Sequence, residues 1–191
     1  WKAVKAHLGF TLENKENYLQ KSNVGLYTEL FDMVKVYKLF FDNGDTIGTA
    51  QLNQSLLDMW NISLQELDRI ATENMKKMFP AKMAPLDTIL SSESSLPVLV
   101  LTAGDAFSAA AGLYEEQLKN YREKVKEDFY LLPSSKHEFL VIPKSAMNEE
   151  EAFEMLQHGN EHAVEKEDLL SRNLYAFTEK GFVCCRMANV H

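Results

Sequence analysis

Hydrophobic and polar positions along the chain indicate strands that are arranged mostly in hairpins. Residues 33–41 (MVKVYKLFF) are rich in β-branched and aromatic side chains, and residues 46–52 (TIGTAQL) follow after a turn with an Asn-Gly dipeptide. A strand, an Asn-Gly turn and a second strand form the strongest short-range hairpin signal. Residues 128–132 with 138–143, and the segment 174–185, predict two more hairpins.

Three segments with apolar residues three and four positions apart predict helices. The first begins at Ser63 and Glu66, which form a capping-box pattern. The second covers residues 103–125 and is predicted to be the longest helix. The third is capped by Asn148, opens with glutamates that suit the helix dipole, and is predicted to end near Asn160.

The remaining segments complete the predicted order β-β-α-β-α-β-β-α-β-β. Residues 81–96 predict a loop, and residues 97–102 (PVLVLT) predict a strand that is buried on both faces because polar and apolar positions do not alternate. Residues 1–32 predict a poorly defined helical N-terminal extension, followed by a single domain over residues 33–191. We therefore expect an α+β fold, a mostly antiparallel sheet built from hairpins with two or three helices packed on it.

Length and charge narrow the possible functions. The chain has 191 residues, 46% of them hydrophobic, which suits one globular domain. Its net charge of −8 argues against nucleic acid and against an anionic membrane surface as partners. Residues 149–168 hold eight acidic side chains and one lysine, so −7 of this charge belongs to one segment. A basic partner, if there is one, is expected to meet that segment.

The sequence points to a cytoplasmic protein without a membrane helix. No apolar run approaches the 18 residues that a membrane-spanning helix needs. Cys184 and Cys185 are adjacent, a spacing that disfavours a disulfide between them. We predict two free thiols, one on each face of a strand, and free thiols are typical of a reducing compartment.

Residues 133–138 (PSSKHE) bring together two hydroxyls, an imidazole and a carboxylate at a turn between strands. A Ser-His-acid nucleophile system needs the base within hydrogen-bond reach of the serine and oriented by the acid. Alternation along a strand places Ser135 and His137 on one face and Glu138 on the other. The pattern therefore favours a rigid polar turn that binds a ligand or partner.

The motif H-x-x-E-H at His158 and His162 is the main candidate for a metal site, since Cys184 and Cys185 lack nearby partners such as a C-x-x-C motif. Two histidines at i and i+4 bind zinc only when they share a helix face, and the expected helix end at Gly159-Asn160 removes that geometry. Glycine-rich phosphate-binding motifs are also missing from the sequence. We therefore predict neither a metal nor a cofactor.

Several of these segments together resemble the uncharacterised bacterial family catalogued as domain of unknown function 5688, found largely in gut Clostridia. The matching features are Trp60 before the capped helix, Asn74, the VLT strand, the PSS-x-HE turn, Asn160, and Leu170-Ser171 before the last hairpin. The resemblance covers roughly residues 33–178, and the PSS-x-HE turn is its most specific part. It implies an intracellular bacterial protein and supplies no activity.

Two hypotheses follow from the sequence. The first is a non-enzymatic intracellular binding or interaction module whose partner is an unknown protein or small molecule. Its candidate binding residues are Ser134, Ser135, His137, Glu138, Asn74 and Asn160. For Asn74, on the apolar face of its helix, a structural clamp on a neighbouring loop or strand is favoured over a ligand contact. The alternative is a hydrolase or transferase that uses His137 as base with Ser134, Ser135 or Glu138.

Overall fold

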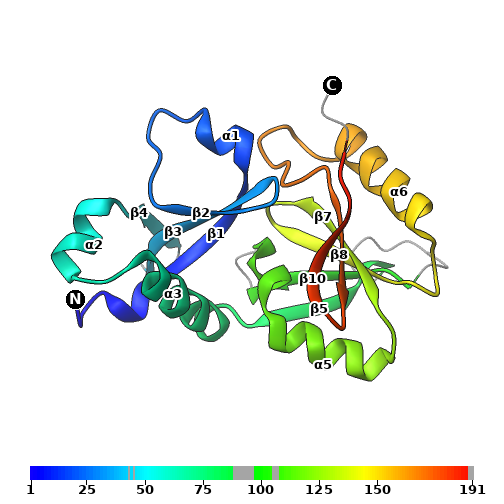
Figure 1. The fold of residues 1–191 in the computed structure, drawn as a ribbon, viewed down its shortest axis with the longest axis horizontal. Helices are drawn as coiled ribbons and strands as arrows, with labels where there is room; N and C mark the ends of the chain where they lie inside the picture. The colour runs from blue at the N-terminus through cyan, green and yellow to red at the C-terminus, as the bar shows by residue number, and fades with distance from the viewer. Residues whose placement is uncertain (43, 45, 88–96, 105–107, 189–191) are drawn as a thin grey trace.

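The computed structural model describes residues 1–42, 44, 46–87, 97–104 and 108–188. Two antiparallel sheets form its body, with helices packed around them (Figure 1). The small sheet has the order β1-β3-β2, with β4 also paired to β3, and the large sheet has the order β10-β9-β7-β8-β6-β5. The predicted α+β class is confirmed, and the element order roughly follows the prediction.

The helices and strands have the following bounds. The small sheet consists of β1 (Leu8–Asn14), β2 (Tyr27–Leu30), β3 (Met33–Asp42) and β4 (Ile47–Gln51). The large sheet consists of β5 (Ala81–Pro85), β6 (Leu99–Ala103), β7 (Phe129–Ser135), β8 (Glu138–Pro143), β9 (Leu174–Thr178) and β10 (Gly181–Arg186). The α-helices are α1 (Lys15–Leu19), α2 (Gln54–Trp60), α3 (Leu64–Met78), α5 (Glu115–Val125) and α6 (Glu149–His162), and the 3-10 helices are η1 (Lys5–His7) and η3 (Ala109–Leu113).

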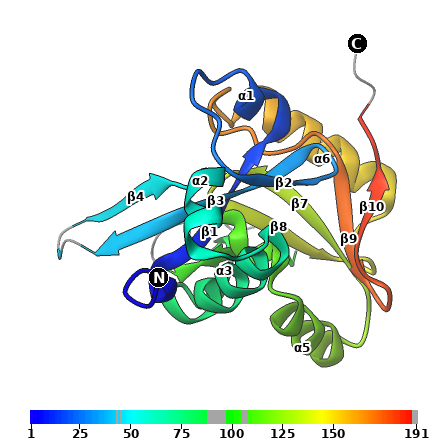
Figure 2. The same cartoon turned by 60° about the vertical axis from the view of Figure 1, so that its left-hand side comes forward.

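The β3–β4 hairpin is confirmed and extends beyond the rest of the small sheet. Strand β1 pairs with β3 as far as Leu39, whereas β4 pairs with β3 as far as Asp42, which lies opposite Ile47. The last residues of β3 and the first of β4 therefore form a two-stranded ribbon that projects from the body (Figure 2). This ribbon forms one side of the candidate functional site.

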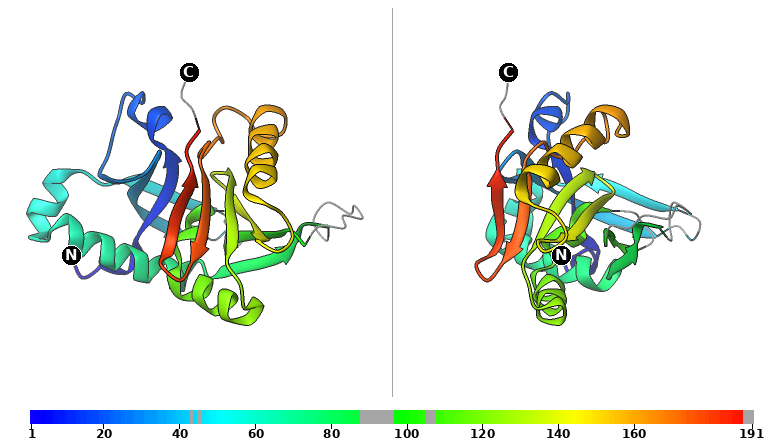
Figure 3. Two further views of the ribbon diagram at one scale, coloured as in Figure 1. Left: turned by 45° about the vertical axis from the view of Figure 1, so that its right-hand side comes forward. Right: turned by 90° about the vertical axis from the view of Figure 1, so that its right-hand side faces the viewer.

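One hydrophobic core joins the two sheets. It contains Phe10 of β1, Tyr37 of β3, Met75 of α3 and the rings of Phe139 and Phe177 from the large sheet, all buried. A second core lies on the other face of the large sheet, which α6 covers (Figure 3).

The two free cysteines of β10 separate between these cores. Cys184 packs against the core between the sheets, and Cys185 packs against the core beneath α6. The predicted placement of the thiols on opposite faces of one strand is confirmed.

The N-terminal segment differs from the predicted helical extension. Apart from η1 and α1, it supplies strands β1 and β2, both paired with β3. Leu8, Phe10 and Leu12 alternate along β1 and are all buried, which is the period-2 pattern of a strand. The helical spacing of Trp1, Val4 and Leu8 overlapped this alternation and led to the wrong secondary structure there.

Two further predictions need correction. Residues 81–96, predicted as a loop, include β5 at the edge of the large sheet, where the terminal Pro85 is tolerated; residues 88–96 lie outside the described part. The long helix over residues 103–125 is instead divided into η3 and α5 around Tyr114, and residues 105–107 lie outside the described part. Tyr114 is fully buried and its hydroxyl donates to the carbonyl of Phe79, 3.1 Å away, so the chain changes direction to bury this ring.

Candidate functional site

The turn between β7 and β8 is held by a network around the hydroxyl of Ser135. This hydroxyl donates to Glu138 Oε1 at 2.8 Å and accepts the backbone N–H of His137 at 3.0 Å. Ser135 and Glu138 are cross-strand partners, so both side chains lie on the same face. The expectation that Glu138 points away from Ser135 is wrong, because the chain reverses between them. Ser134 lies beside them, at the β-bulge between Leu132 and Ser135.

The side chain of His137 pairs with an acid that the sequence prediction missed. His137 Nε2 lies 3.4 Å from Asp168 Oδ1, and Lys136 Nζ lies 2.7 Å from the same oxygen. The hydrogen bond from Lys136 is the main cause that lowers the pKa of Asp168, and His137 contributes to the same shift. The backbone N–H of Lys136 also donates to the carbonyl of Asp168. Asp168 therefore fastens the turn to the loop that follows α6.

A cleft of about 770 Å³ separates this turn from the small sheet. Its lining comes from β1, β3, α3, the β3–β4 ribbon and the β7–β8 turn: Thr11, Leu12, Glu13, Lys21, Lys38, Phe40, Asp42, Gly44, Thr46, Ile47, Thr49, Met75, Phe79, Ser108, Lys136 and His137. Of the six candidate binding residues, all within the described ranges, His137 is the one that lines this cleft.

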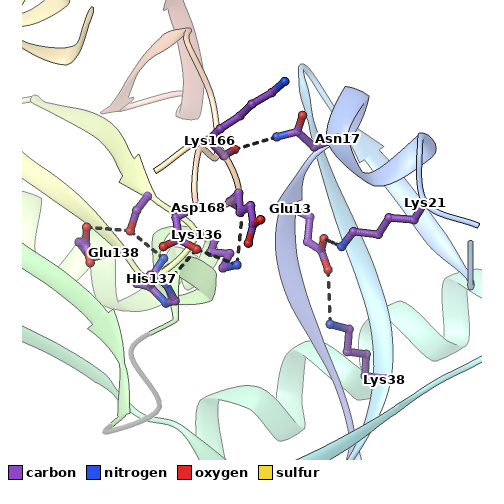
Figure 4. Close-up of polar contacts among 11 residues, drawn as sticks. Glu13, Asn17, Lys21, Lys38, Lys136, His137, Glu138, Lys166 and Asp168 are labelled. Atoms are coloured by element: carbon purple, nitrogen blue, oxygen red, sulfur yellow. Dashed lines mark hydrogen bonds and ion pairs between the residues drawn. The ribbon is translucent and has the colours of Figure 1, made fainter. Parts of the chain in front are cut away.

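Basic groups surround two carboxylates in and beside the cleft (Figure 4). Glu13 pairs with Lys21 and, at 3.4 Å, with Lys38, whose side chain is only 15% exposed. Burial lowers the pKa of Lys38; Glu13 opposes this shift, and the charges of Lys21 and Lys136 add to it. Each carboxylate, Glu13 and Asp168, is thus shared by two basic side chains.

Asn74 acts as the structural clamp that its position predicted. From α3, its Nδ2 donates to the carbonyl of Lys5 at 2.7 Å and to that of Leu8 at 3.0 Å. These bonds hold η1 and the start of β1 against the helix.

Replacing Asn74 with alanine is expected to lower the free energy of unfolding by about 1–2 kcal/mol, because the carbonyls of Lys5 and Leu8 each lose one hydrogen bond. Chemical denaturation measures this loss. Asn17→Ala is the matched control, since it removes one exposed bond to the carbonyl of Lys166. An Asn74→Ala protein as stable as the control would contradict the clamp.

Asn160 forms its hydrogen bond with the segment before β9, away from the β7–β8 turn. It is buried on α6, and its Nδ2 donates to the carbonyl of Ser171 at 3.0 Å. Its Oδ1 is buried and, among the described residues, has no hydrogen-bond partner. Asn160 thus ties α6 to the segment before β9.

The two histidines of the H-x-x-E-H motif do share a helix, contrary to the expected helix end. Helix α6 continues through Gly159 and Asn160 to His162, and its capping box at Asn148 is present. The rings of His158 and His162 stack with centroids 4.3 Å apart, and His162 Nδ1 contacts the carbonyl of His158. Within the described residues, no group of three or more His, Cys, Asp or Glu side chains is arranged to hold a metal ion.

A second polar network, centred on Asp32, connects the two sheets. Asp32 follows β2 and accepts hydrogen bonds from Ser171 Oγ at 2.6 and 2.7 Å, from Tyr175 OH and from the backbone N–H of Arg172. Burial raises the pKa of Tyr175, and the charge of Asp32 adds to this shift. Leu170-Ser171 was noted in the sequence as a family feature, but nothing there indicated Asp32 as its partner.

Together, these features define an α+β protein of two packed antiparallel sheets with a basic cleft between the small sheet and the β7–β8 turn. The chain belongs to a family of unknown function, DUF5688, whose model matches residues 1–179 of 191. The match begins at residue 1, so the expected start of the resemblance near residue 33 is wrong. No curated protein and no solved structure matches the chain. No helix in the described part is both long and apolar enough to cross a membrane.

Proposed function

We propose that this protein is a non-enzymatic binding module that holds a small molecule in the cleft between the small sheet and the β7–β8 turn. The observation that carries the proposal is the cleft itself: its volume of about 770 Å³ lies within the usual range of small-molecule sites. Lys136 and His137 line it and are held in place by Asp168. Preorganised polar groups at the edge of a partly apolar pocket are typical of such sites.

The geometry supports binding better than the alternative of a hydrolase or transferase based on His137. The hydroxyl of Ser135 donates to Glu138, so its proton is directed away from an imidazole base. Ser135 is also only 6% exposed, which disfavours attack on a substrate in the cleft. The imidazole of His137 lies beside Asp168, and Ser135 accepts the backbone N–H of His137 while its own hydroxyl donates to Glu138.

We also propose that the protein works in a bacterial cytoplasm. The support is its pair of free thiols, Cys184 and Cys185, on adjacent positions of β10. Free cysteines are typical of a reducing compartment.

A substitution that fills the cleft tests the binding function. Thr49→Trp adds a large ring to the cleft lining, whereas Ala50→Trp adds the same ring at the next, exposed position of β4, which does not line the cleft. Small molecules retained by each purified protein from a cell extract are identified by mass spectrometry. We expect the wild type and Ala50→Trp to retain the same compound and Thr49→Trp to lose it. Equal retention by all three proteins would contradict the proposed cleft.

A further inference from the structure

We propose that the cleft binds an organic anion, with a carboxylate or phosphate group held by Lys38 and Lys136 and an apolar body packed against Ile47. This inference rests on the proposed function and adds the chemical class of the ligand. Two features of the cleft lead to it: a group of basic side chains at one end, and an exposed aliphatic side chain beside two aromatic rings at the other.

Basic side chains gather at one end of the cleft. Lys21, Lys38, Lys136 and His137 line it, together with the carboxylates of Glu13 and Asp42. Lys21 and Lys38 share Glu13, and Lys136 and His137 share Asp168. Each pair of basic groups thus has one carboxylate, and Lys38 feels the charges of both Lys21 and Lys136. Helix α6, by contrast, has no lysine or arginine and carries Glu149, Glu150, Glu151, Glu154 and Glu161. An anion is therefore attracted to the cleft and repelled by α6.

Lys38 and Lys136 are placed to contribute strongly to the binding of an anion. Lys38 is largely buried, and its contact with Glu13 is long at 3.4 Å, so a ligand oxygen could offer it a shorter bond. Lys136 reaches the boundary where the cleft adjoins a second hollow of about 340 Å³, which also contains Glu13 and Lys21. A hydrogen bond to a charged group in such a partly buried place is worth more than one on the open surface.

The other end of the cleft combines apolar side chains with one carboxylate, that of Asp42, which is the cross-strand partner of Ile47. Ile47 begins β4 and is 47% exposed, although it is a large aliphatic residue, and it lines the cleft. The rings of Phe40 and Phe79, with centroids 5.3 Å apart, continue this surface towards the core. An organic anion with an apolar body would contact both ends of the cleft, whereas inorganic phosphate would contact only the basic end.

Four probes test the class by isothermal titration calorimetry on the full chain: phenyl phosphate, benzoate, inorganic phosphate and benzyl alcohol. A comparison of phenyl phosphate with benzoate distinguishes a ligand with a phosphate group from a ligand with a carboxylate group. We expect one of these two to bind, with inorganic phosphate and benzyl alcohol weaker by at least about tenfold, because each lacks one half of the recognition. Raising the salt concentration is expected to weaken the binding.

Matched lysine variants identify the anion site. Lys38→Met and Lys136→Met are each expected to weaken the preferred probe about tenfold or more, while Lys38→Arg keeps most of the affinity. Lys119→Met is the control, since Lys119 lies exposed on α5 and pairs with Glu115. Thermal unfolding of every variant confirms that it is folded.

Three outcomes would overturn the anion class: equal binding of inorganic phosphate and phenyl phosphate, equal binding of benzyl alcohol, or lysine variants that bind like Lys119→Met. The result for Thr49→Trp separates this failure from failure of the binding function. If a retained compound is lost in Thr49→Trp but no probe binds, the cleft is a site for another chemistry. If Thr49→Trp retains the same compound as the wild type, the proposed binding function is contradicted as well.

Discussion

Asp32→Ala is expected to lower the free energy of unfolding by about 3 kcal/mol or more. Asp32 accepts hydrogen bonds from Ser171, Tyr175 and the backbone of Arg172, and Ser171 and Tyr175 are fully buried. Each hydrogen bond to a charged group contributes about 1.5–3 kcal/mol. Ser171 Oγ and Tyr175 OH lie 3.2 Å apart, so without Asp32 one hydroxyl can donate to the other and the second is left without an acceptor. Because these bonds connect the β2–β3 hairpin to the segment before β9, both sheets are affected. Chemical denaturation measures the change.

Asp58→Ala provides the control for Asp32. Asp58 is exposed on α2 and accepts one hydrogen bond from Gln54, so its removal is expected to cost less than about 0.5 kcal/mol. Asp32→Asn keeps the shape and one acceptor oxygen, and an intermediate stability is expected. If Asp32→Ala were as stable as Asp58→Ala, the network would not hold the sheets together.

Gly112→Ala is expected to lower the free energy of unfolding by about 1–3 kcal/mol. A Cβ atom at this position in η3 would lie 2.5 Å from two ring carbons of Phe139, which is completely buried in the core between the sheets. Interiors are packed too densely for the ring to shift without cost. The change is measured by denaturation monitored through tertiary-structure signals.

Gly159→Ala is the matched control and is expected to raise the free energy of unfolding instead of lowering it. A Cβ at this position in α6 meets nothing within 4 Å. Alanine in a helix interior is favoured over glycine by about 0.5–1 kcal/mol, so this variant is expected to gain stability. A stable Gly112→Ala protein would show that η3 does not pack closely under Phe139.

The fold was predictable where the local sequence carried the signal. The β3–β4 hairpin followed from its Asn-Gly turn, and the start of α6 followed from Asn148 and the glutamates after it. Strand β1 was missed because Leu8 also continues a helical spacing from Trp1 and Val4. The break between η3 and α5 was missed because apolar spacing does not show that Tyr114 and Gly112 must fit beneath other elements.

The candidate site was only partly predictable for a similar reason. The β7–β8 turn and the place of His137 in it came from the sequence. The partner of His137 did not, because Asp168 lies 31 positions further along the chain in an acidic segment. Lys38 and Glu13 come from strands of the other sheet, and the proximity of a strand to a turn of another sheet depends on how the sheets pack.

The most direct test of the basic cleft as a binding site is a titration of the ¹⁵N-labelled protein with phenyl phosphate, followed by amide NMR shifts. We predict saturable shifts concentrated at Thr11, Lys38, Ile47 and His137, which line the cleft from three strands and the β7–β8 turn. Shifts that are largest in α6, or that grow linearly without saturation across the surface, would contradict it.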